Sequence, residues 1–283
     1  GNMKSSNPVF ARSAEFNGRG GAVANDPSQW QVDLNGSPTH TEIGTGSGRM
    51  TIDSVVEKTA ITLGLLTVAA AVTWFLLPDL DSGDVSADNA AFGKAAAFAG
   101  IGAIVGLVLS LVNSFKKIIS PALVLAYAVF EGVFIGAFSK VISTFVGDSS
   151  IVFQAVLGTL VAFAGTLAAY KFFNIQVTDR FRKIVTIAMV SVVGVMLVNW
   201  ILSLTGVLES GGLRGFNTLG LLVSCALVVL AVFMLIMDFD YVEQGVAAGI
   251  PERESWRAAF GLTVTVIWLY IEILRILAIL RGD

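Results

Sequence analysis

Seven long apolar stretches constrain this chain more than any other feature of its sequence. About 20 apolar residues cross a bilayer as a helix, because the hydrocarbon layer is roughly 30 Å thick and a helix rises about 1.5 Å per residue. Since lipid offers no partner to a backbone amide, each stretch is predicted to be a helix. The sequence therefore predicts an all-α membrane protein with seven transmembrane helices. The stretches are residues 59–77, 95–115, 118–139, 149–170, 184–208, 215–237 and 257–280.

Composition agrees with that class and argues against several functions. Charged residues make up 14% of the chain, against about 25% in a soluble domain. The formal net charge is −3 and no basic patch is present, so no nucleic-acid partner is expected. Cys225 and His40 are the only residues of their types, which argues against a disulfide and against a zinc site. We expect no catalytic residues and no enzyme activity.

The first 50 residues have a different character from the rest. They are polar and contain the breaker segments 35–38 and 44–48, so they cannot bury enough apolar surface to fold alone. We predict that residues 1–50 form a disordered cytoplasmic tail and that residues 51–283 form the transmembrane domain. Ser54 and Glu57 have the spacing of a capping box, which predicts that the first helix begins at Ser54.

The Lys and Arg residues of the loops predict an orientation. Thirteen fall on the side of the N-terminal tail and four on the other side. Cytoplasmic loops of membrane proteins carry the excess of basic residues. The N-terminus is therefore predicted to be cytoplasmic and, with seven helices, the C-terminus to be outside. The four residues on the outer side are Lys94, Lys140, Arg214 and Arg281.

Two pairs of glycines have the spacing of close helix contacts. Gly102 precedes Gly106 by four residues, and Gly132 precedes Gly136 by the same interval. Such residues share a helix face, and small side chains let two backbones approach. We interpret both pairs as packing within the chain rather than as a dimer interface.

Three ionisable side chains lie inside the apolar stretches. Glu131 is 13 residues past the inner end of its stretch, and Glu272 is 15 past the inner end of its own, which places both roughly 20 Å deep. Arg275 follows Glu272 by three residues, so the two are predicted to pair. Glu131 must meet Arg275, reach water or be protonated. Such charges cost about 2.5–3.5 kcal/mol on insertion scales and either serve function or fasten helices together.

A second group of charges lies at the inner ends of the stretches. Asp238 and Asp240 follow the sixth stretch, and Lys116 and Lys117 stand on the same side. Carboxylates close together in a low-dielectric site cannot all ionise. If a basic side chain bridges them when they are ionised, protonation releases that bridge. Grouped carboxylates also suit a hard cation such as calcium, although an acidic helix end facing basic neighbours explains Asp240 equally well.

Motifs spread over nearly the whole chain resemble those of one family. The tail has Asn-Pro-Val-Phe at 7–10 and Phe-Asn-Gly-Arg-Gly-Gly at 16–21. The apolar stretches have Phe-Glu-Gly at 130–132 and Leu-Tyr-Ile-Glu at 269–272, and Asp-Phe-Asp at 238–240 directly follows the sixth stretch. Together they resemble the Bax inhibitor 1 family (TMBIM or YccA-like proteins), in a bacterial branch with a polar N-terminal extension. The resemblance implies a seven-helix Bax inhibitor 1-like bundle with a central helix, in the bacterial inner membrane.

The resemblance also implies an activity and a site. Members of this family are pH-sensitive calcium leaks in which two acidic residues share a proton and a basic residue tethers them. Carried over, the two acids are Asp238 and Glu272, with calcium at or between them, and the basic latch is Lys116 or Lys117. The chain departs from the family where Glu replaces the usual Asp at 272. It also has Arg275 where many relatives are neutral, which makes Arg275 an alternative latch.

The leading hypothesis is therefore a cation leak gated by protonation of buried carboxylates. Its pH sensor and ion pathway are Asp238, Glu272, Glu131 and Asp240, and its latch is Arg275, Lys116 and Lys117. Two rivals stay open: a non-conducting regulator of a membrane protein, such as a protease, for which the tail is the supporting feature, and a proton-coupled exporter. Expected partners are the lipid bilayer, Ca²⁺, protons and, for the regulator, another membrane protein. No bound cofactor is expected, and the sequence carries no signal for an oligomeric state.

Overall fold

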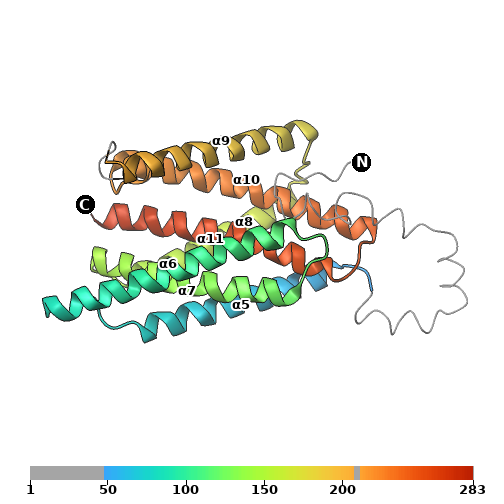
Figure 1. Cartoon of the computed structure of the whole chain (residues 1–283). Coiled ribbons are helices and arrows are strands. Elements are labelled where there is room, and N and C mark those ends of the chain that lie inside the picture. Colours follow the sequence, from blue (N-terminus) through green and yellow to red (C-terminus); the bar gives the residue numbers. More distant parts are fainter. Residues whose placement is uncertain (1–47, 207–210, 283) are drawn as a thin grey trace, which may run out of the picture. The chain divides into compact units, whose positions relative to one another are not determined.

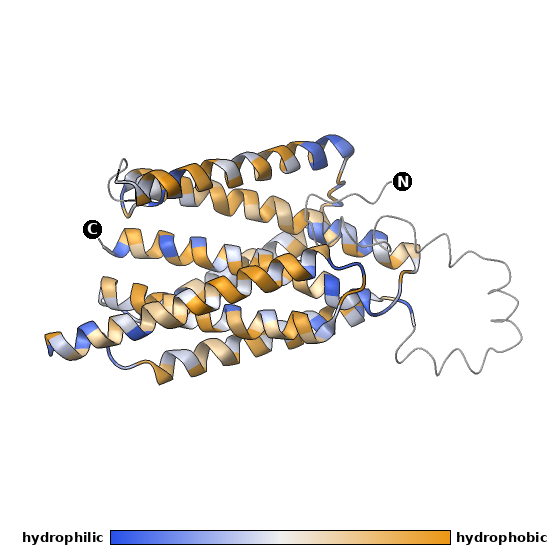
Figure 2. Ribbon diagram, in the orientation of Figure 1, coloured by the Kyte–Doolittle hydropathy of each residue, from blue (hydrophilic) through white to orange (hydrophobic). Residues whose placement is uncertain are grey.

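The structure, a computed structural model, describes residues 48–206 and 211–282. In that part of the chain seven helices are long and apolar enough to cross a membrane. Figure 2 shows apolar residues along most of each helix. The predicted all-α membrane fold is confirmed, whereas tail residues 1–47 lie outside the described part. The helices are α5 (Ile52–Leu76), α6 (Val85–Phe115), α7 (Pro121–Val146), α8 (Ser150–Phe172), α9 (Asp179–Leu204), α10 (Thr218–Ala248) and α11 (Glu254–Arg281), with the 3-10 turn η1 (Gly212–Arg214) before α10 (Figure 1).

The first helix begins earlier than predicted. Thr51 Oγ1 accepts a hydrogen bond from the amide of Ser54 at 3.0 Å, and Ser54 Oγ accepts one from the amide of Thr51 at 2.9 Å. These reciprocal bonds make Thr51 the N-cap, with Ser54 in the role that Glu usually has in a capping box. The expected start at Ser54 is therefore wrong, because the Thr51 hydroxyl already satisfies the first turn.

Two helices extend well beyond the apolar stretches that predicted them. α6 begins ten residues before residue 95, and α10 continues eleven residues past residue 237. Asp84 caps α6, where its Oδ1 accepts hydrogen bonds from the amides of Ser86 at 3.1 Å and Ala87 at 3.4 Å. Hydropathy detects only the apolar part of a helix that lies in lipid, so it does not detect the polar turns at the helix ends.

The chain divides into two compact units. Within the described residues, unit 1 comprises 48–76, 96–137 and 238–263. Unit 2 comprises 77–95, 138–206, 211–237 and 264–282. The division passes through α6, α7, α10 and α11, so each of these helices contributes to both units.

Glycines bring the helices of unit 1 close together. A Cβ built on Gly132 of α7 would lie 2.5 Å from the carbonyl oxygen of Leu66 in α5, and one on Gly136 would meet the carbonyl oxygen of Ala70. A Cβ on Gly102 of α6 would lie 2.8 Å from the carbonyl oxygen of Phe130 in α7. Both predicted glycine pairs thus pack within the chain, and α7 contacts α5 and α6 through backbone-to-backbone approach.

Unit 2 is held by polar and aromatic contacts between its helices. Ser139 of α7 and Tyr270 of α11 share a hydrogen bond of 2.6 Å. Phe181 of α9 packs edge-on against Phe233 of α10, with ring centroids 5.7 Å apart. Burial differs sharply among the helices. In an 18-residue apolar segment of each helix, 61% of the residues are buried in α11 and 11% in α9. α11 therefore carries charges away from lipid, whereas α9 faces lipid along most of its length.

Candidate functional site: a buried ion pair and its groove

An ion pair in unit 2 joins Glu272 of α11 to Arg214 of η1. Arg214 Nη2 donates to Glu272 Oε1 at 2.6 Å, and Nη1 donates to Oε2 at 3.1 Å. This two-point contact is the strong, geometrically specific form of an Arg–carboxylate pair. The Glu272 side chain is 5% exposed and that of Arg214 is 24% exposed. The predicted pairing of Glu272 with Arg275 is therefore wrong, because Arg214 presents the fork that the carboxylate accepts.

Arg275 contacts the same loop one turn further along α11. Its Nη2 donates to the backbone carbonyl oxygen of Arg214, and its guanidinium carbon lies 4.9 Å from the centre of the Phe216 ring. The residue is 8% exposed. The side chain thus binds the loop backbone and an aromatic face, and it does not bridge to the carboxylate of Glu272 in the predicted way.

Asn199 of α9 fixes the shape of the loop. Its Nδ2 donates to the carbonyl oxygen of Gly211 at 3.1 Å, and its Oδ1 accepts from the amide of Leu213 at 2.8 Å. Gly211 and Gly212 have φ angles of 78° and 58°, in the left-handed region that favours glycine. The position of Arg214 is therefore set by Asn199 on one helix and by α11 on another.

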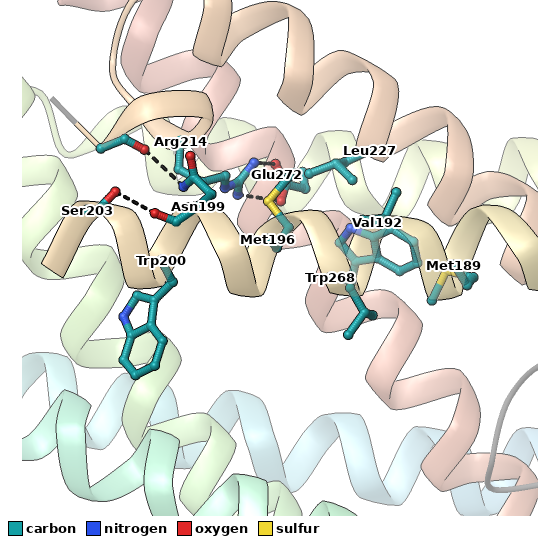
Figure 3. A pocket seen from close by; sticks show the side chains of 12 residues that line it. Met189, Val192, Met196, Asn199, Trp200, Ser203, Arg214, Leu227, Trp268 and Glu272 are labelled. Atoms are coloured by element: carbon teal, nitrogen blue, oxygen red, sulfur yellow. Dashed lines mark hydrogen bonds and ion pairs between the residues drawn. The ribbon is translucent and has the colours of Figure 1, made fainter. Parts of the chain in front are cut away.

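A cavity of about 490 Å³ opens beside this ion pair, and we call it the α9 groove (Figure 3). Its α9 residues recur every three or four positions, so they form one face of the helix. Figure 3 shows Asn199, Ser203 and Arg214 toward one end, and Trp268 and Met189 toward the other. The lining residues are Met189, Val192, Val193, Met196, Asn199, Trp200 and Ser203 of α9, with Gly211, Arg214, Leu227, Trp268 and Glu272.

Glu131 of α7 lies in unit 1 against a glycine of α6. A Cβ built on Gly106 would lie 3.0 Å from the carboxyl carbon of Glu131 and nearer still to its Oε1, so glycine leaves room for this carboxylate. Glu131 is ten residues into α7, or about 15 Å, whereas Glu272 is eighteen residues into α11, or about 27 Å. Because Glu131 belongs to unit 1 and Glu272 to unit 2, their similar depth in the membrane stays a prediction.

The two aspartates in the C-terminal part of α10 differ in burial. Asp238 is 0% exposed. Asp240 is partly buried, and its Oδ2 accepts a hydrogen bond from Gln244 Nε2 at 2.6 Å. Both belong to unit 1, whereas Glu272 and Arg275 belong to unit 2. Over residues 48–206 and 211–282, no three His, Cys, Asp or Glu side chains gather closely enough to hold a metal ion.

The proposed latch residues Lys116 and Lys117 are exposed, and it is their backbone that another residue binds. Arg257 Nη2 donates to both of their carbonyl oxygens, at 2.8 and 3.0 Å. Arg257 Nε donates to Glu254 Oε2 at 2.7 Å, and both of these side chains are 0% exposed. Arg257 therefore fastens the α6–α7 loop to the start of α11 within unit 1, a role that its place in the charge count did not reveal.

Gly48 and Met50 form backbone hydrogen bonds with the loop before α11. Met50 donates its amide to the carbonyl oxygen of Ile250 at 2.8 Å, and Glu252 donates to the carbonyl oxygen of Gly48 at 2.7 Å. Met50 is 1% exposed. Gly48 and Met50, which composition assigned to the tail, therefore contact the loop before α11.

Comparison with known proteins bears on nearly the whole chain. The family model described as Bax inhibitor 1 like matches residues 7–282. The matched range covers all of the residues that the structure describes. No curated protein matches the chain.

Proposed function

The chain belongs to the Bax inhibitor 1 like family, and on that premise we propose that it is a pH-sensitive leak pathway for cations, calcium among them. The observation that carries the proposal is the burial of carboxylates within membrane spans, since Asp238 is 0% and Glu272 4% exposed. Ionisable groups in the bilayer are costly and usually mark ion or proton pathways. Carboxylate oxygens are also the ligands that calcium prefers.

In the proposed mechanism, the Glu272–Arg214 pair keeps the pathway shut. Ionised Glu272 holds Arg214, and through it the η1 loop, against α11. A protonated carboxyl lacks the charge that Arg214 neutralises. Arg275 of α11, which also contacts this loop, then adds repulsion to Arg214. Falling pH therefore favours release of the loop, and rising pH favours the closed state. Asp238 and Glu131 supply oxygen ligands to the passing ion.

The proposal includes an orientation in the membrane. With the N-terminus in the cytoplasm of a bacterial cell, the η1 loop and the C-terminus face outward. The excess of Lys and Arg in the loops on the side of the tail supports this placement. Protons on the outer side would then reach Glu272 first.

Calcium flux into liposomes that contain purified protein, compared at pH 6 and pH 8, tests the function. We expect faster flux at pH 6 and loss of the pH response when Asp238→Asn is combined with Glu272→Gln. Asp79→Asn, which removes an exposed loop carboxylate, is the matched control and should behave as wild type. Absence of flux at both pH values, or wild-type flux from the double variant at both, would rule out the proposal.

Deletion of residues 1–47 separates this function from that of a non-conducting regulator. The deletion stops short of Gly48 because residues 48–50 pair with the loop before α11. A leak pathway formed by the spans should keep its flux and pH response. A non-conducting regulator would show no flux with or without the tail, and the deletion would instead remove its binding to a membrane-protein partner.

A further inference from the structure

α9 contacts the rest of unit 2 less than any other described span does. In its apolar segment 11% of the residues are buried, against 61% in that of α11. Trp200 is 60% exposed and Leu197 is 54% exposed, and the α9 groove opens between the helix and Trp268 of α11 (Figure 3). The position of α9 therefore depends on the surrounding lipid, whereas that of α11 depends on its protein neighbours.

The apolar length of α9 is close to the thickness of a bilayer. Residues 184–204 contain no charged side chain, which corresponds to about 32 Å of helix, and the hydrocarbon layer is roughly 30 Å thick. Arg180, Arg182 and Lys183 precede this segment, and such basic residues anchor a helix end at the membrane surface. Because a span that is too long for its bilayer tilts, a thinner bilayer tilts α9 about its basic end.

The other end of α9 holds the loop that carries the ion pair. Asn199 is 6% exposed and forms two hydrogen bonds with this loop, one to the carbonyl oxygen of Gly211 and one from the amide of Leu213. The same loop is bound to α11 by the two hydrogen bonds between Arg214 and Glu272. The η1 loop is thus bound both to a helix that lipid positions and to a helix that protein positions.

We propose that α9 responds to the thickness of the bilayer and that Asn199 transmits this response to the Glu272–Arg214 pair. Asn199 is 16 residues beyond Lys183, or about 24 Å, so a change of about 10° in tilt, well within the range for membrane helices, moves it by about 4 Å. A hydrogen bond does not survive such a shift, and the η1 loop cannot follow both helices.

The bonds of Asn199 break first in a thinner bilayer. They join neutral groups, whereas the bonds between Arg214 and Glu272 join charged groups and are roughly twice as strong. Without Asn199 the η1 loop loses the contacts that fix its shape, so Arg214 is presented less well to Glu272 and the ion pair weakens. The effect on cation flux rests on the function proposed above, whereas the coupling between α9 and the loop does not.

Amide hydrogen exchange of Leu213 tests the coupling without any measurement of flux. The full chain is placed at pH 8 in nanodiscs of dimyristoleoyl-, dioleoyl- or dierucoyl-phosphatidylcholine, which form thin, intermediate and thick bilayers. We expect the Leu213 amide to exchange about fivefold faster in the thin bilayer than in the thick one, as the loss of one hydrogen bond implies. Exchange of Leu213 at one rate in all three lipids overturns the proposal.

Two variants of α9 show whether Asn199 is the link. Asn199→Ala should make exchange of Leu213 fast in all three lipids. Ser203→Ala is the matched control, because the Ser203 hydroxyl bonds to the carbonyl oxygen of Asn199 within α9, and it should keep the dependence on lipid. If Asn199→Ala keeps that dependence as well, the link lies elsewhere and the proposal fails.

Calcium flux at pH 8 in liposomes of the same three lipids extends the test to the ion pair, with protein-free liposomes as the background. We expect the highest flux in the thin bilayer. If the protein conducts at pH 6 but its flux at pH 8 is equal in all three lipids, transmission to the ion pair is refuted. A protein that conducts in no lipid at either pH refutes the leak function, while lipid-dependent exchange of Leu213 still supports the coupling.

Discussion

Replacing Arg214 with glutamine is expected to destabilise the protein more than replacing Glu272 with glutamine. Arg214→Gln leaves a carboxylate whose side chain is 5% exposed, whereas Glu272→Gln leaves a guanidinium that is 24% exposed and can turn toward water. Removing one partner of a buried pair costs about 3–5 kcal/mol, chiefly because the other charge stays buried. We expect a loss of about 3 kcal/mol for Arg214→Gln, and of about 1 kcal/mol for Glu272→Gln, which keeps a hydrogen-bonding side chain.

Reversible unfolding in detergent micelles at pH 8, with both single variants and the double variant, measures these free energies. The double variant removes both charges, so its loss should be smaller than the sum of the single losses by more than about 1 kcal/mol. Equal losses from the two single variants, to within about 0.5 kcal/mol, would refute the argument from burial. A double variant whose loss equals the sum would show that the two side chains do not interact.

Three further outcomes follow from the contacts of other residues. Gly136→Ala should lower the free energy of unfolding in the same micelle assay by about 1–3 kcal/mol, because its Cβ meets the backbone of α5. Gly64→Ala is the control, because it adds a Cβ in open space. It should be neutral or stabilising by up to about 1 kcal/mol. Arg257→Gln should cost about 3–5 kcal/mol and speed amide hydrogen exchange in the loop at residues 116–120, with the exposed Arg180→Gln as control. Asp148, between α7 and α8, has a pKa lowered from 3.8 by hydrogen bonds from Ser150 and by Arg281. Its stabilising contribution is therefore present above about pH 4 and is lost as pH falls through the lowered pKa. A carboxyl NMR titration should show that Ser150→Ala raises this pKa toward 3.8.

The sequence predicts the spans well because one physical constraint dominates them. Backbone groups in lipid have no other partner, so a continuous apolar run of sufficient length becomes a helix. The glycine contacts of Gly132 and Gly136 were also predictable, since their four-residue spacing is local in the sequence. The early start of α6 at Val85 was not, because its carboxylate cap lies outside the apolar pattern that hydropathy detects. The start of α5 at Ile52 was missed because the spacing of Ser54 and Glu57 suggested a capping box, whereas Thr51 caps the helix.

The ion-pair partner of Glu272 could not be predicted from the sequence. Glu272 was predicted as a functional acid from its place in an apolar stretch, yet its partner Arg214 lies 58 residues away in the chain. Proximity in sequence favoured Arg275, which is one turn away on the same helix. The available signal was that Arg214 is one of only four basic residues in the loops predicted to face outward. Contacts between a loop and a distant helix depend on how the chain folds back, and spacing alone does not encode them.

Calcium flux through Arg214→Gln in liposomes at pH 8 tests most directly whether the Glu272–Arg214 pair closes the pathway. Arg281→Gln, which removes a more exposed ion pair of unit 2, is the control. If the pair is the closed latch, Arg214→Gln conducts at pH 8 as fast as wild type does at pH 6, and Arg281→Gln stays closed. Flux through Arg214→Gln that remains at the wild-type level for pH 8 would contradict the mechanism.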